Sequence, residues 1–105
     1  MSGIVTVYAT FAGRAEAERI GRQMVEERLA ACVNILGDAH SIYRWQGQIE
    51  TATETAALFK TAADRAEPLT ARIITLHSYD YPAVTVWPIS TSTPSYEAWV
   101  LEQCR

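Results

Sequence analysis

The sequence contains two long strand-forming segments joined by a short turn, and this hairpin limits what the chain can fold into. The first segment begins as an apolar, buried strand at residues 30–35, bends at Gly37-Asp38 and continues as an extended run at residues 41–45. After a turn at Gln46-Gly47, the second segment covers residues 49–61 with alternating side chains. Each arm is about twice the usual strand length of 5–6 residues. We therefore expect a hairpin whose tip extends beyond the core that 105 residues can build.

The tip of this hairpin is predicted to face another chain. Alternation places Tyr43 and Trp45 on one face of the strand, and Ile42 and Arg44 on the other. Unpaired strand edges and exposed aromatic rings promote aggregation, and proteins cover such surfaces by pairing them with a partner. The residues alone therefore predict an oligomer.

Two segments have the periodicity of amphipathic helices. Residues 14–28 carry apolar side chains at helical spacing and mostly charged side chains on the opposite face. Gly21 costs this helix about 1 kcal/mol relative to alanine, so we expect the helix to approach the sheet closely there. Residues 62–77 return to helical spacing, but Pro68 is unfavourable inside a helix. The regular helix is expected to begin at Pro68, or after an irregular first turn at residues 64–67.

The order of the elements predicts the fold. Further strands are expected at residues 4–10 and 83–89, and Pro88 makes the latter an edge strand. Thr93-Pro94 is typical of a helix start and predicts a terminal helix. The chain is therefore expected to be a single α+β domain over residues 1–105, a ferredoxin-like βαββαβ sandwich with a long hairpin and an extra C-terminal helix.

Charge and cysteine usage narrow the partners and the compartment. Nine basic and twelve acidic residues give a net charge of −3, without a basic stripe, so neither nucleic acid nor an anionic membrane is an expected partner. Cys32 and Cys104 form no metal-type or disulfide framework, which favours a reducing setting. The first residues lack the basic segment of a secretion signal, and no apolar run approaches the ~18–20 residues of a membrane helix. We expect a soluble, cytoplasmic protein.

Two functional classes lack their characteristic residues. The sequence has no nucleophile elbow, no phosphate-binding glycine loop and no informative Cys-His spacing, so no catalytic residues are predicted and an enzyme is not expected. An RNA-recognition domain would have a similar topology. Its sheet, however, presents stacking aromatic and basic residues, which the strand at 49–61 largely lacks.

Several motifs in order resemble one known family. The chain carries R-L-A-A-C-V-N-I at 28–35, S-I-Y-R-W-Q-G-Q-I-E at 41–50, Lys60-Thr61, L-H-S-Y-D-Y-P at 76–82 and Y-E-A-W at 96–99. Together they resemble the CutA family of divalent-cation tolerance proteins. The resemblance implies a ferredoxin-like subunit that forms a homotrimer through its long hairpins, binds divalent copper and acts in metal tolerance. A likeness to trimeric PII-type signalling proteins implies the alternative of sensing a small anionic ligand at the subunit interface.

The resemblance also implies copper ligands, which are only partly present. The family's proposed set is a cysteine near the end of the first strand and two adjacent histidines after the second helix. Here the strand ends Val7-Tyr8-Ala9-Thr10, and only His77 matches a histidine. Imidazole suits Cu²⁺ and a trimer repeats each ligand, so His77 with Asp80 or Glu54 is the candidate metal set. The alternative is that His77 caps a helix C-terminus. No cofactor is required; Cu²⁺ or another divalent cation is the candidate ligand.

A second set of residues points to a small-molecule pocket. Tyr43, Trp45, Lys60 and Tyr79 place aromatic rings and a lysine near the expected subunit boundary, where they could hold a small anion. The alternative is that Tyr43 and Trp45 anchor the contact between trimer subunits, as interface aromatics usually do.

Overall fold

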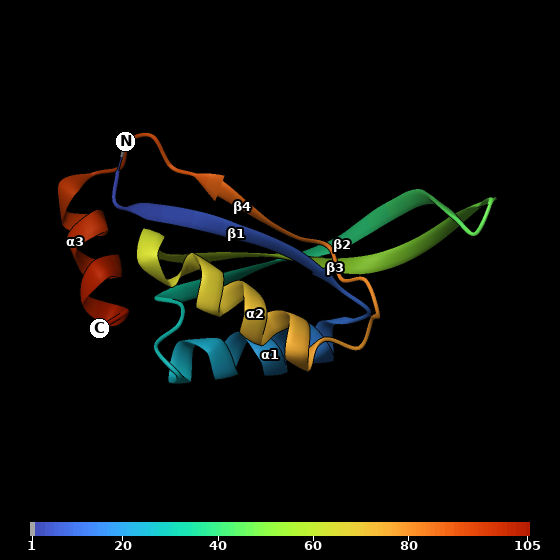
Figure 1. Cartoon of the computed structure of the whole chain (residues 1–105), viewed down its shortest axis with the longest axis horizontal. Coiled ribbons are helices and arrows are strands. Elements are labelled where there is room, and N and C mark those ends of the chain that lie inside the picture. The colour runs from blue at the N-terminus through green and yellow to red at the C-terminus, as the bar shows by residue number, and fades with distance from the viewer. Residues whose placement is uncertain (1) are drawn as a thin grey trace.

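The computed structural model describes residues 2–105, which form one sheet with helices on one side and at one end (Figure 1). The chain forms four strands and two longer helices, and a third helix follows the last strand. The elements are β1 (Ile4–Phe11), α1 (Arg14–Glu26), β2 (Cys32–Trp45), β3 (Gln48–Ala62), the 3₁₀ turn η1 (Ala63–Arg65), α2 (Ala66–Leu76), β4 (Val84–Pro88) and α3 (Pro94–Gln103).

The strands form an antiparallel sheet in the order β2-β3-β1-β4. Helices α1 and α2 lie side by side on one face, while the other face is open (Figure 1). The predicted ferredoxin-like α+β fold is therefore confirmed. Helix α3 packs against the end of the sheet away from the hairpin tip, where Val100 and Cys104 are buried with Ile4.

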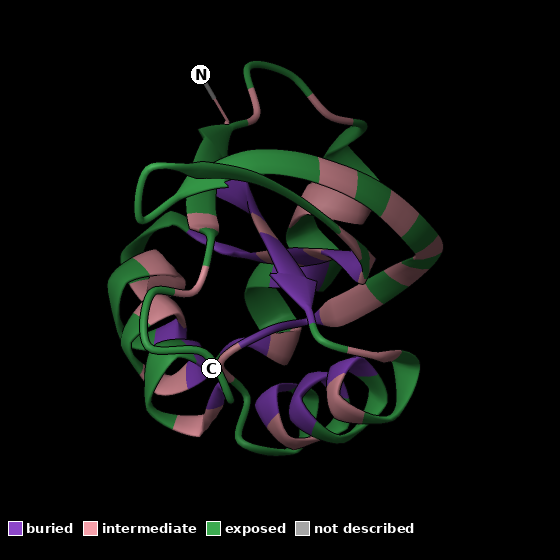
Figure 2. Cartoon of the chain, turned by 90° about the vertical axis from the view of Figure 1, so that its right-hand side faces the viewer, coloured by how far each residue is buried: buried purple, intermediate pink, exposed green. Residues whose placement is uncertain are grey.

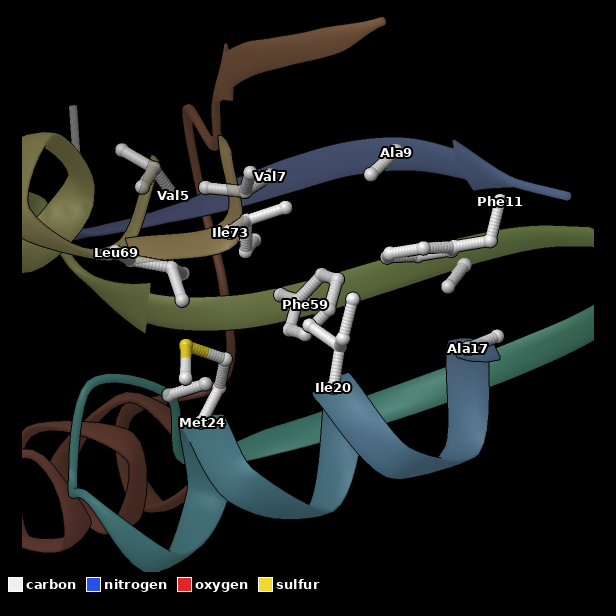
Figure 3. Close-up of a cluster of buried hydrophobic side chains, with 12 residues drawn as sticks. Val5, Val7, Ala9, Phe11, Ala17, Ile20, Met24, Phe59, Leu69 and Ile73 are labelled. Atoms are coloured by element: carbon white, nitrogen blue, oxygen red, sulfur yellow. The ribbon is translucent and has the colours of Figure 1, made fainter. Parts of the chain in front are cut away.

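The main core lies between the sheet and the two helices (Figure 3). Alternate residues of β1 and β3 point toward α1 and α2, and each large side chain buried there contributes about 1.5–3 kcal/mol through the hydrophobic effect. The largest of these side chains are Phe11, Phe59, Ile20, Met24, Leu69 and Ile73, none of them exposed. This core fixes the positions of β1 and β3. Strand β3 continues into the hairpin, and the loop after α2 contacts the end of β1 through His77.

The predicted close approach at Gly21 is confirmed. A Cβ atom added at Gly21 would lie 2.9 Å from the Val33 Cγ1 atom of β2, which is closer than two carbon atoms can pack. The missing side chain therefore lets α1 settle against the start of the hairpin.

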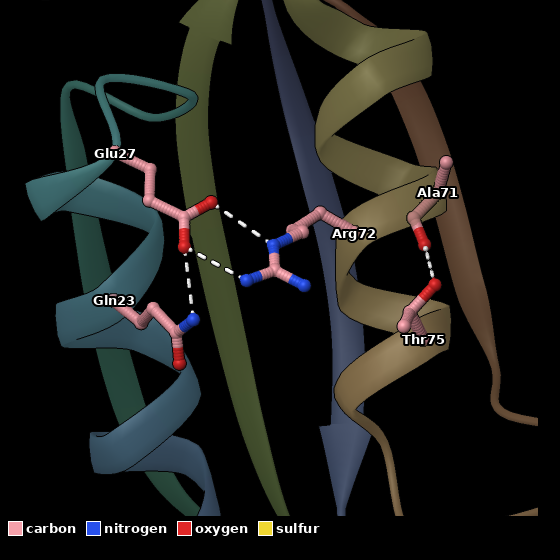
Figure 4. A network of polar contacts seen from close by, with 5 residues as sticks. All are labelled: Gln23, Glu27, Ala71, Arg72 and Thr75. Atoms are coloured by element: carbon pink, nitrogen blue, oxygen red, sulfur yellow. Dashed lines mark hydrogen bonds and ion pairs between the residues drawn. The ribbon is translucent and has the colours of Figure 1, made fainter.

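A salt bridge links the two long helices on their solvent side. The guanidinium of Arg72 on α2 donates two hydrogen bonds to the carboxylate of Glu27, which follows α1, both at 3.0 Å (Figure 4). These bonds from Arg72 and one from Gln23 lower the pKa of Glu27. The pair lies at the surface between the two helices.

The hairpin differs from its prediction at one point. At the bend expected near Gly37-Asp38, β2 continues as one strand instead of dividing into two runs, and the pairing register with β3 shifts between Ile35 and Gly37. Leu36 is the extra, exposed residue of a β-bulge, and Gly37 adopts a φ of +111° that other residues rarely accept. The strand can therefore absorb one residue without stopping.

The bulge reverses which residues of β2 face the helices. Before it, Val33 pairs with Phe59 and faces the helices; after it, Tyr43 pairs with Glu50 on the open face. Because side chains alternate with a strict period of two, Tyr43 would lie on the helix side without the extra residue. The bulge thus turns the aromatic residues of the tip toward the open face.

The hairpin extends well beyond the core, as predicted. The chain measures 45 × 26 × 22 Å, and the hairpin forms one end of the long axis (Figure 1), the end that faces the viewer in Figure 2. Over the described residues 32–54, no side chain is buried. Within one chain, the far half of both strands is therefore held by strand pairing and by surface contacts such as that of Trp45 with Tyr81, without a buried core.

The bounds of the second helix and the fourth strand are close to those predicted. Helix α2 starts at Ala66 after the 3₁₀ turn η1, so an irregular first turn is present and Pro68 is not the first helical residue. Pro68 is tolerated because backbone N–H groups in the first helical turn have no intrahelical partner to lose. Strand β4 is an edge strand as expected and ends at Pro88. None of the helices in residues 2–105 is long and apolar enough to cross a membrane.

Candidate functional site

A cavity of about 600 Å³ lies between the open face of the hairpin and the loop 78–83 that follows α2. We call it the hairpin cavity. One wall comes from β2, β3 and the end of β1, and the other from the loop. Its lining residues are Thr10, Ser41, Tyr43, Trp45, Glu50, Glu54, Ser78, Tyr79, Asp80, Tyr81 and Ala83.

The strand wall follows from the pairing register of the hairpin. Tyr43 lies directly opposite Glu50, and Trp45 lies two residues further along the same face. Opposed residues in an antiparallel pair project to the same side, so the rings and the Glu50 carboxylate share one surface. Glu54 lies on this face four residues further along β3, toward the core.

The loop wall faces the strand wall with two tyrosines and an aspartate. The rings of Trp45 and Tyr81 lie 5.8 Å apart at an angle of 57°, a tilted aromatic pair that joins the hairpin tip to the loop. Tyr79 and Asp80 complete this wall. The structure thus brings five of the seven predicted site residues to the cavity, and Glu54 lies beside Tyr79. They are Tyr43, Trp45, Glu54, Tyr79 and Asp80.

His77 lies beneath the loop and is 8% exposed. Its ring stacks on Phe11, with centroids 5.0 Å apart, and its two nitrogens are both hydrogen bonded. Nδ1 accepts the backbone N–H of Tyr79 at 3.1 Å, so Nε2 carries the proton and donates to the carbonyl of Thr10 at 2.8 Å. This imidazole locks the start of the loop to the end of β1.

Glu16 holds the same loop from the side of α1. Its carboxylate accepts the backbone N–H of Ser78 at 2.8 Å, the Ser78 hydroxyl at 3.1 Å and the backbone N–H of Ala12 at 3.2 Å. Burial alone would raise the pKa of Glu16, but these hydrogen bonds outweigh it and the pKa is lowered. His77 and Glu16 together fix the position of the loop wall.

The cavity is acidic. Glu50, Glu54 and Asp80 line it, and among the residues that the structure describes no lysine, arginine or histidine does. Burial, followed by the neighbouring Glu54 carboxylate, raises the pKa of Tyr79 to about 12, so this phenol keeps its proton. The site therefore favours a positively charged ligand.

Lys60 is not part of the cavity. It pairs with Cys32 at the far end of β3, and its Nζ donates to the Oδ1 of Asn34 at 2.5 Å. Six residues of strand separate it from Glu54, about 20 Å at the usual rise per residue. The predicted set of Tyr43, Trp45, Lys60 and Tyr79 is therefore not assembled within one chain.

The candidate metal residues are also incompletely assembled within one chain. Glu54 and Asp80 line the cavity, while both ring nitrogens of His77 are engaged in hydrogen bonds. Within the described part of the chain, no three His, Cys, Asp or Glu side chains gather closely enough to hold a metal ion. A metal held here would need donors from outside this chain.

Sequence reasoning overlooked two principal lining residues, Tyr81 and Glu50. Glu50 could have been found from the two-residue turn at Gln46-Gly47, because counting outward from that turn pairs Tyr43 with Glu50. Tyr81 lies in the same loop motif as Tyr79, but only the three-dimensional structure shows its ring against Trp45.

The chain is similar to known proteins over nearly its whole length. Residues 5–103 match the family model described as CutA1 divalent ion tolerance protein. The chain is 35% identical to the divalent-cation tolerance protein CutA of Pyrococcus horikoshii, covering 97% of this chain and 99% of that one. It is 34% identical to the chloroplastic protein CutA of Arabidopsis thaliana, of which it spans 56% of the length.

Solved structures agree over the whole fold. The crystal structure of CutA from Xylella fastidiosa superposes with a TM-score of 0.96 at 38% identity, covering 99% of this chain and 100% of that one. The structure of the periplasmic divalent cation tolerance protein CutA from Archaeoglobus fulgidus superposes with a TM-score of 0.94 at 33% identity, covering 97% and 99%.

Proposed function

The chain belongs to the CutA1 divalent ion tolerance family, and on that premise we propose that it is a non-enzymatic homotrimer that acts in the response to divalent cations. Direct binding of Cu²⁺ or another divalent cation is part of the proposal. The observation that carries it is the hairpin, whose residues 32–54 have no buried side chain in a single chain and whose tip forms one wall of an acidic cavity.

The hairpin supports the trimer. Strands β2 and β3 are 14 and 15 residues long, and β2 is an edge strand with unpaired backbone groups. Large apolar side chains on both faces of the hairpin are exposed, namely Leu36, Ile42, Tyr43, Trp45 and Ile49. Edges and apolar surfaces of this size are covered by other chains in stable proteins, and closed cyclic symmetry covers each copy equally.

The carboxylates of the cavity support cation binding. Glu54 and Asp80 are hard oxygen donors in a site without a basic side chain among the described lining residues. A trimer presents every donor three times, so a neighbouring copy could supply the ligands that one chain lacks. His77 would join them only if its ring gave up the hydrogen bond to Thr10 or to Tyr79.

The alternative of a PII-like trimer sensing a small anion has less support. Three carboxylates line the cavity, and Lys60, which was expected to bind the anion, lies elsewhere in the same chain. An anion site would need Lys60 from a neighbouring copy beside Tyr43 and Trp45. Trimers that mix wild-type chains with chains lacking Lys60 would test this arrangement. The negative charge of the cavity favours a cation over an anion.

The trimer is tested by the mass of the protein in solution. We expect light scattering at micromolar concentration to give three times the 11.7 kDa of one chain. Replacing the exposed Ile42 and Ile49 with glutamate should shift the protein toward the single-chain mass, because charges on the hairpin oppose its burial. A wild-type protein with the mass of one chain would refute the trimer.

Metal binding is tested separately by titrating the trimer with Cu²⁺. Glu54→Gln and Asp80→Asn should each weaken binding about tenfold or more if both carboxylates ligate the ion. Asp38→Asn is the matched control, because Asp38 is exposed on the other face of the hairpin, and His40→Ala controls for a surface imidazole. Unchanged affinity in both cavity variants would remove the metal from this cavity.

We also propose a cytoplasmic location. Cys32 and Cys104 are both free thiols, as in proteins of reducing compartments. The CutA protein of Archaeoglobus fulgidus is described as periplasmic, so the periplasm is the competing location for this chain. Fractionation of the source cells should place the protein with cytoplasmic markers; recovery with periplasmic markers would refute this part.

A further inference from the structure

We propose that, in the trimer, Lys60 of each copy enters the hairpin cavity of a neighbouring copy and pairs with its Glu54 carboxylate. This contact deepens the proposed function and rests on its trimer, because a single chain cannot make it. Within one chain the two residues lie six positions apart on β3, about 20 Å at the usual rise per residue. The site is therefore complete only between copies, and a divalent cation that binds Glu54 must displace the ammonium group.

The carboxylates of the cavity need a positive charge once a neighbouring copy covers the hairpin. Glu50, Glu54 and Asp80 line the cavity, and no basic side chain among the described lining residues neutralises them. A carboxylate that is removed from water without an opposite charge is strongly destabilised. Glu54 is already half-buried in the single chain, whereas Glu50 and Asp80 are exposed. Glu54 is therefore the carboxylate that most needs a partner in the trimer.

Lys60 has the complementary need. It follows Phe59, whose ring faces the helices, so Lys60 lies on the open face of the sheet. Its Nζ donates to the neutral amide oxygen of Asn34, and among the described residues no carboxylate pairs with it. An ammonium group that another chain covers is stable there only beside a negative charge.

None of the arginines is placed as Lys60 is. Most of them already contact a carboxylate or a backbone carbonyl within the chain, namely Arg14, Arg28, Arg65, Arg72 and Arg105. Arg19 and Arg22 are exposed on α1, away from the sheet. Arg44 is at the hairpin tip but lies on the helix side, opposite to Tyr43. Within the described residues, Lys60 is therefore the basic side chain that the open face presents.

A ring of three copies brings the two groups together. In a closed cyclic trimer each copy contacts its two neighbours through two different patches. Helices α1 and α2 cover one face of the sheet (Figure 1), so the open faces are the ones to turn toward the axis. On that face the cavity lies at the hairpin end, and Lys60 lies toward α3. The acidic patch of one copy then meets the basic patch of the next.

The surface around Lys60 has the character of an interface. Thr6 pairs with both Lys60 and Trp87, so these two side chains share one row across the open face. Trp87 stacks on Tyr8 with ring centroids 5.1 Å apart and is still 46% exposed. Exposed aromatic residues of this kind commonly anchor the contact between two chains. Lys60 therefore lies beside a surface that a neighbouring hairpin can cover.

The first experiment is zero-length cross-linking of the full chain with a water-soluble carbodiimide, which joins a carboxylate and a touching primary amine as an amide. Lys60 is the only lysine in the sequence, and its distance from Glu54 within one chain excludes a product inside that chain. We expect covalent dimers and trimers on a denaturing gel. Fragmentation mass spectrometry should locate the new bond between Lys60 of one copy and Glu54 of another.

Lys60→Arg is the matched variant, because it keeps the charge but has no primary amine. Light scattering should still give the trimer mass, while the cross-link at position 60 disappears. Glu54→Gln should also lose the bond between these two positions. Asp38→Asn lies outside the cavity and should cross-link as wild type does.

The second experiment measures trimer dissociation in urea for Lys60→Met, Glu54→Gln and the double variant. Each single substitution should raise the protein concentration at half-dissociation about tenfold, and the double variant should exceed neither by much. Residues about 20 Å apart in one chain do not couple, so coupling here reports a contact between copies.

The outcomes separate this contact from the trimer itself. An intact trimer without the cross-link from Lys60 to Glu54, or additive effects of the two substitutions, would overturn the proposal. Cross-links from Lys60 only to other carboxylates would overturn it as well. A wild-type protein with the mass of one chain would instead refute the proposed trimer.

Discussion

The Nδ1 atom of His77 accepts a hydrogen bond from the backbone N–H of Tyr79 at 3.1 Å, while its Nε2 faces the carbonyl of Thr10. This pair of contacts determines the tautomer. We predict that ¹⁵N NMR will show His77 as the neutral form protonated at Nε2. A ring protonated at Nδ1 would mean that the loop is not held as described.

The same contacts predict the effect of His77→Phe on stability. Phenylalanine preserves the stacking on Phe11 but leaves the Thr10 carbonyl and the Tyr79 N–H without their partner. We expect the free energy of unfolding to fall by about 2 kcal/mol, as measured by urea denaturation. The exposed His40→Phe is the control and should change stability by less than about 0.5 kcal/mol.

Glu16 predicts a pH dependence on the acid side. Its pKa is lowered in the folded protein, so its contribution to stability is present above the ordinary value of 4.5 and is lost as pH falls through the folded pKa. Glu16→Gln should cost about 1 kcal/mol at neutral pH. The difference from wild type should shrink in denaturation curves taken at progressively lower pH, and a difference that stays constant would contradict this role of Glu16.

Tyr79 predicts a pH dependence on the alkaline side. Its pKa is raised from 10.0 to about 12, first by burial and then by Glu54, so its contribution to stability is full below pH 10 and is lost as pH rises toward 12. In an NMR titration of the tyrosine rings, Glu54→Gln should move the Tyr79 pKa part of the way back. Asp38→Asn should leave it unchanged, since Asp38 lies outside the cavity.

Gly21 predicts a clash. Gly21→Ala gains about 1 kcal/mol of helix propensity, but its methyl group would lie 2.9 Å from Val33 Cγ1, and overpacking costs about 1–3 kcal/mol. The β-branched Val33 cannot turn aside easily. We expect a net loss of about 1 kcal/mol in thermal or urea unfolding. In the double variant Gly21→Ala with Val33→Ala, the clash should be relieved, so the loss of unfolding free energy should be smaller than the sum of the two single losses. Additive losses would argue against the clash.

Sequence patterns predicted the fold well because most of its segments have a single strong signal. The alternation in residues 49–61, the helical period in residues 14–28 and the Gln46-Gly47 turn each agree with the structure. The helix start was predicted less closely, because a proline is acceptable anywhere in the first helical turn and α2 begins at Ala66, two residues before Pro68. Local residues therefore determine element type better than element ends.

The candidate site could be predicted only where neighbours along the chain are also neighbours in space. Tyr43, Trp45 and Tyr79 share the cavity because the hairpin and the loop meet there. Lys60 was placed with them by sequence pattern, yet the length of β3 carries it to the other end of the strand. His77 was expected as a metal ligand or a helix cap, and its contacts with Thr10 and Phe11 depend on β1, more than sixty residues earlier.

Because of the bulge at Leu36, the sides on which residues of the far hairpin lie depend on whether the number of residues between the bulge and the turn is odd or even. One extra residue there decides that Tyr43 and Trp45, rather than Ile42 and Arg44, face the cavity. Gain or loss of a single residue between Leu36 and the turn would exchange these two sets, while a change of two would lengthen or shorten the arm and keep its sides. Related chains that keep the cavity should therefore vary this segment in even steps.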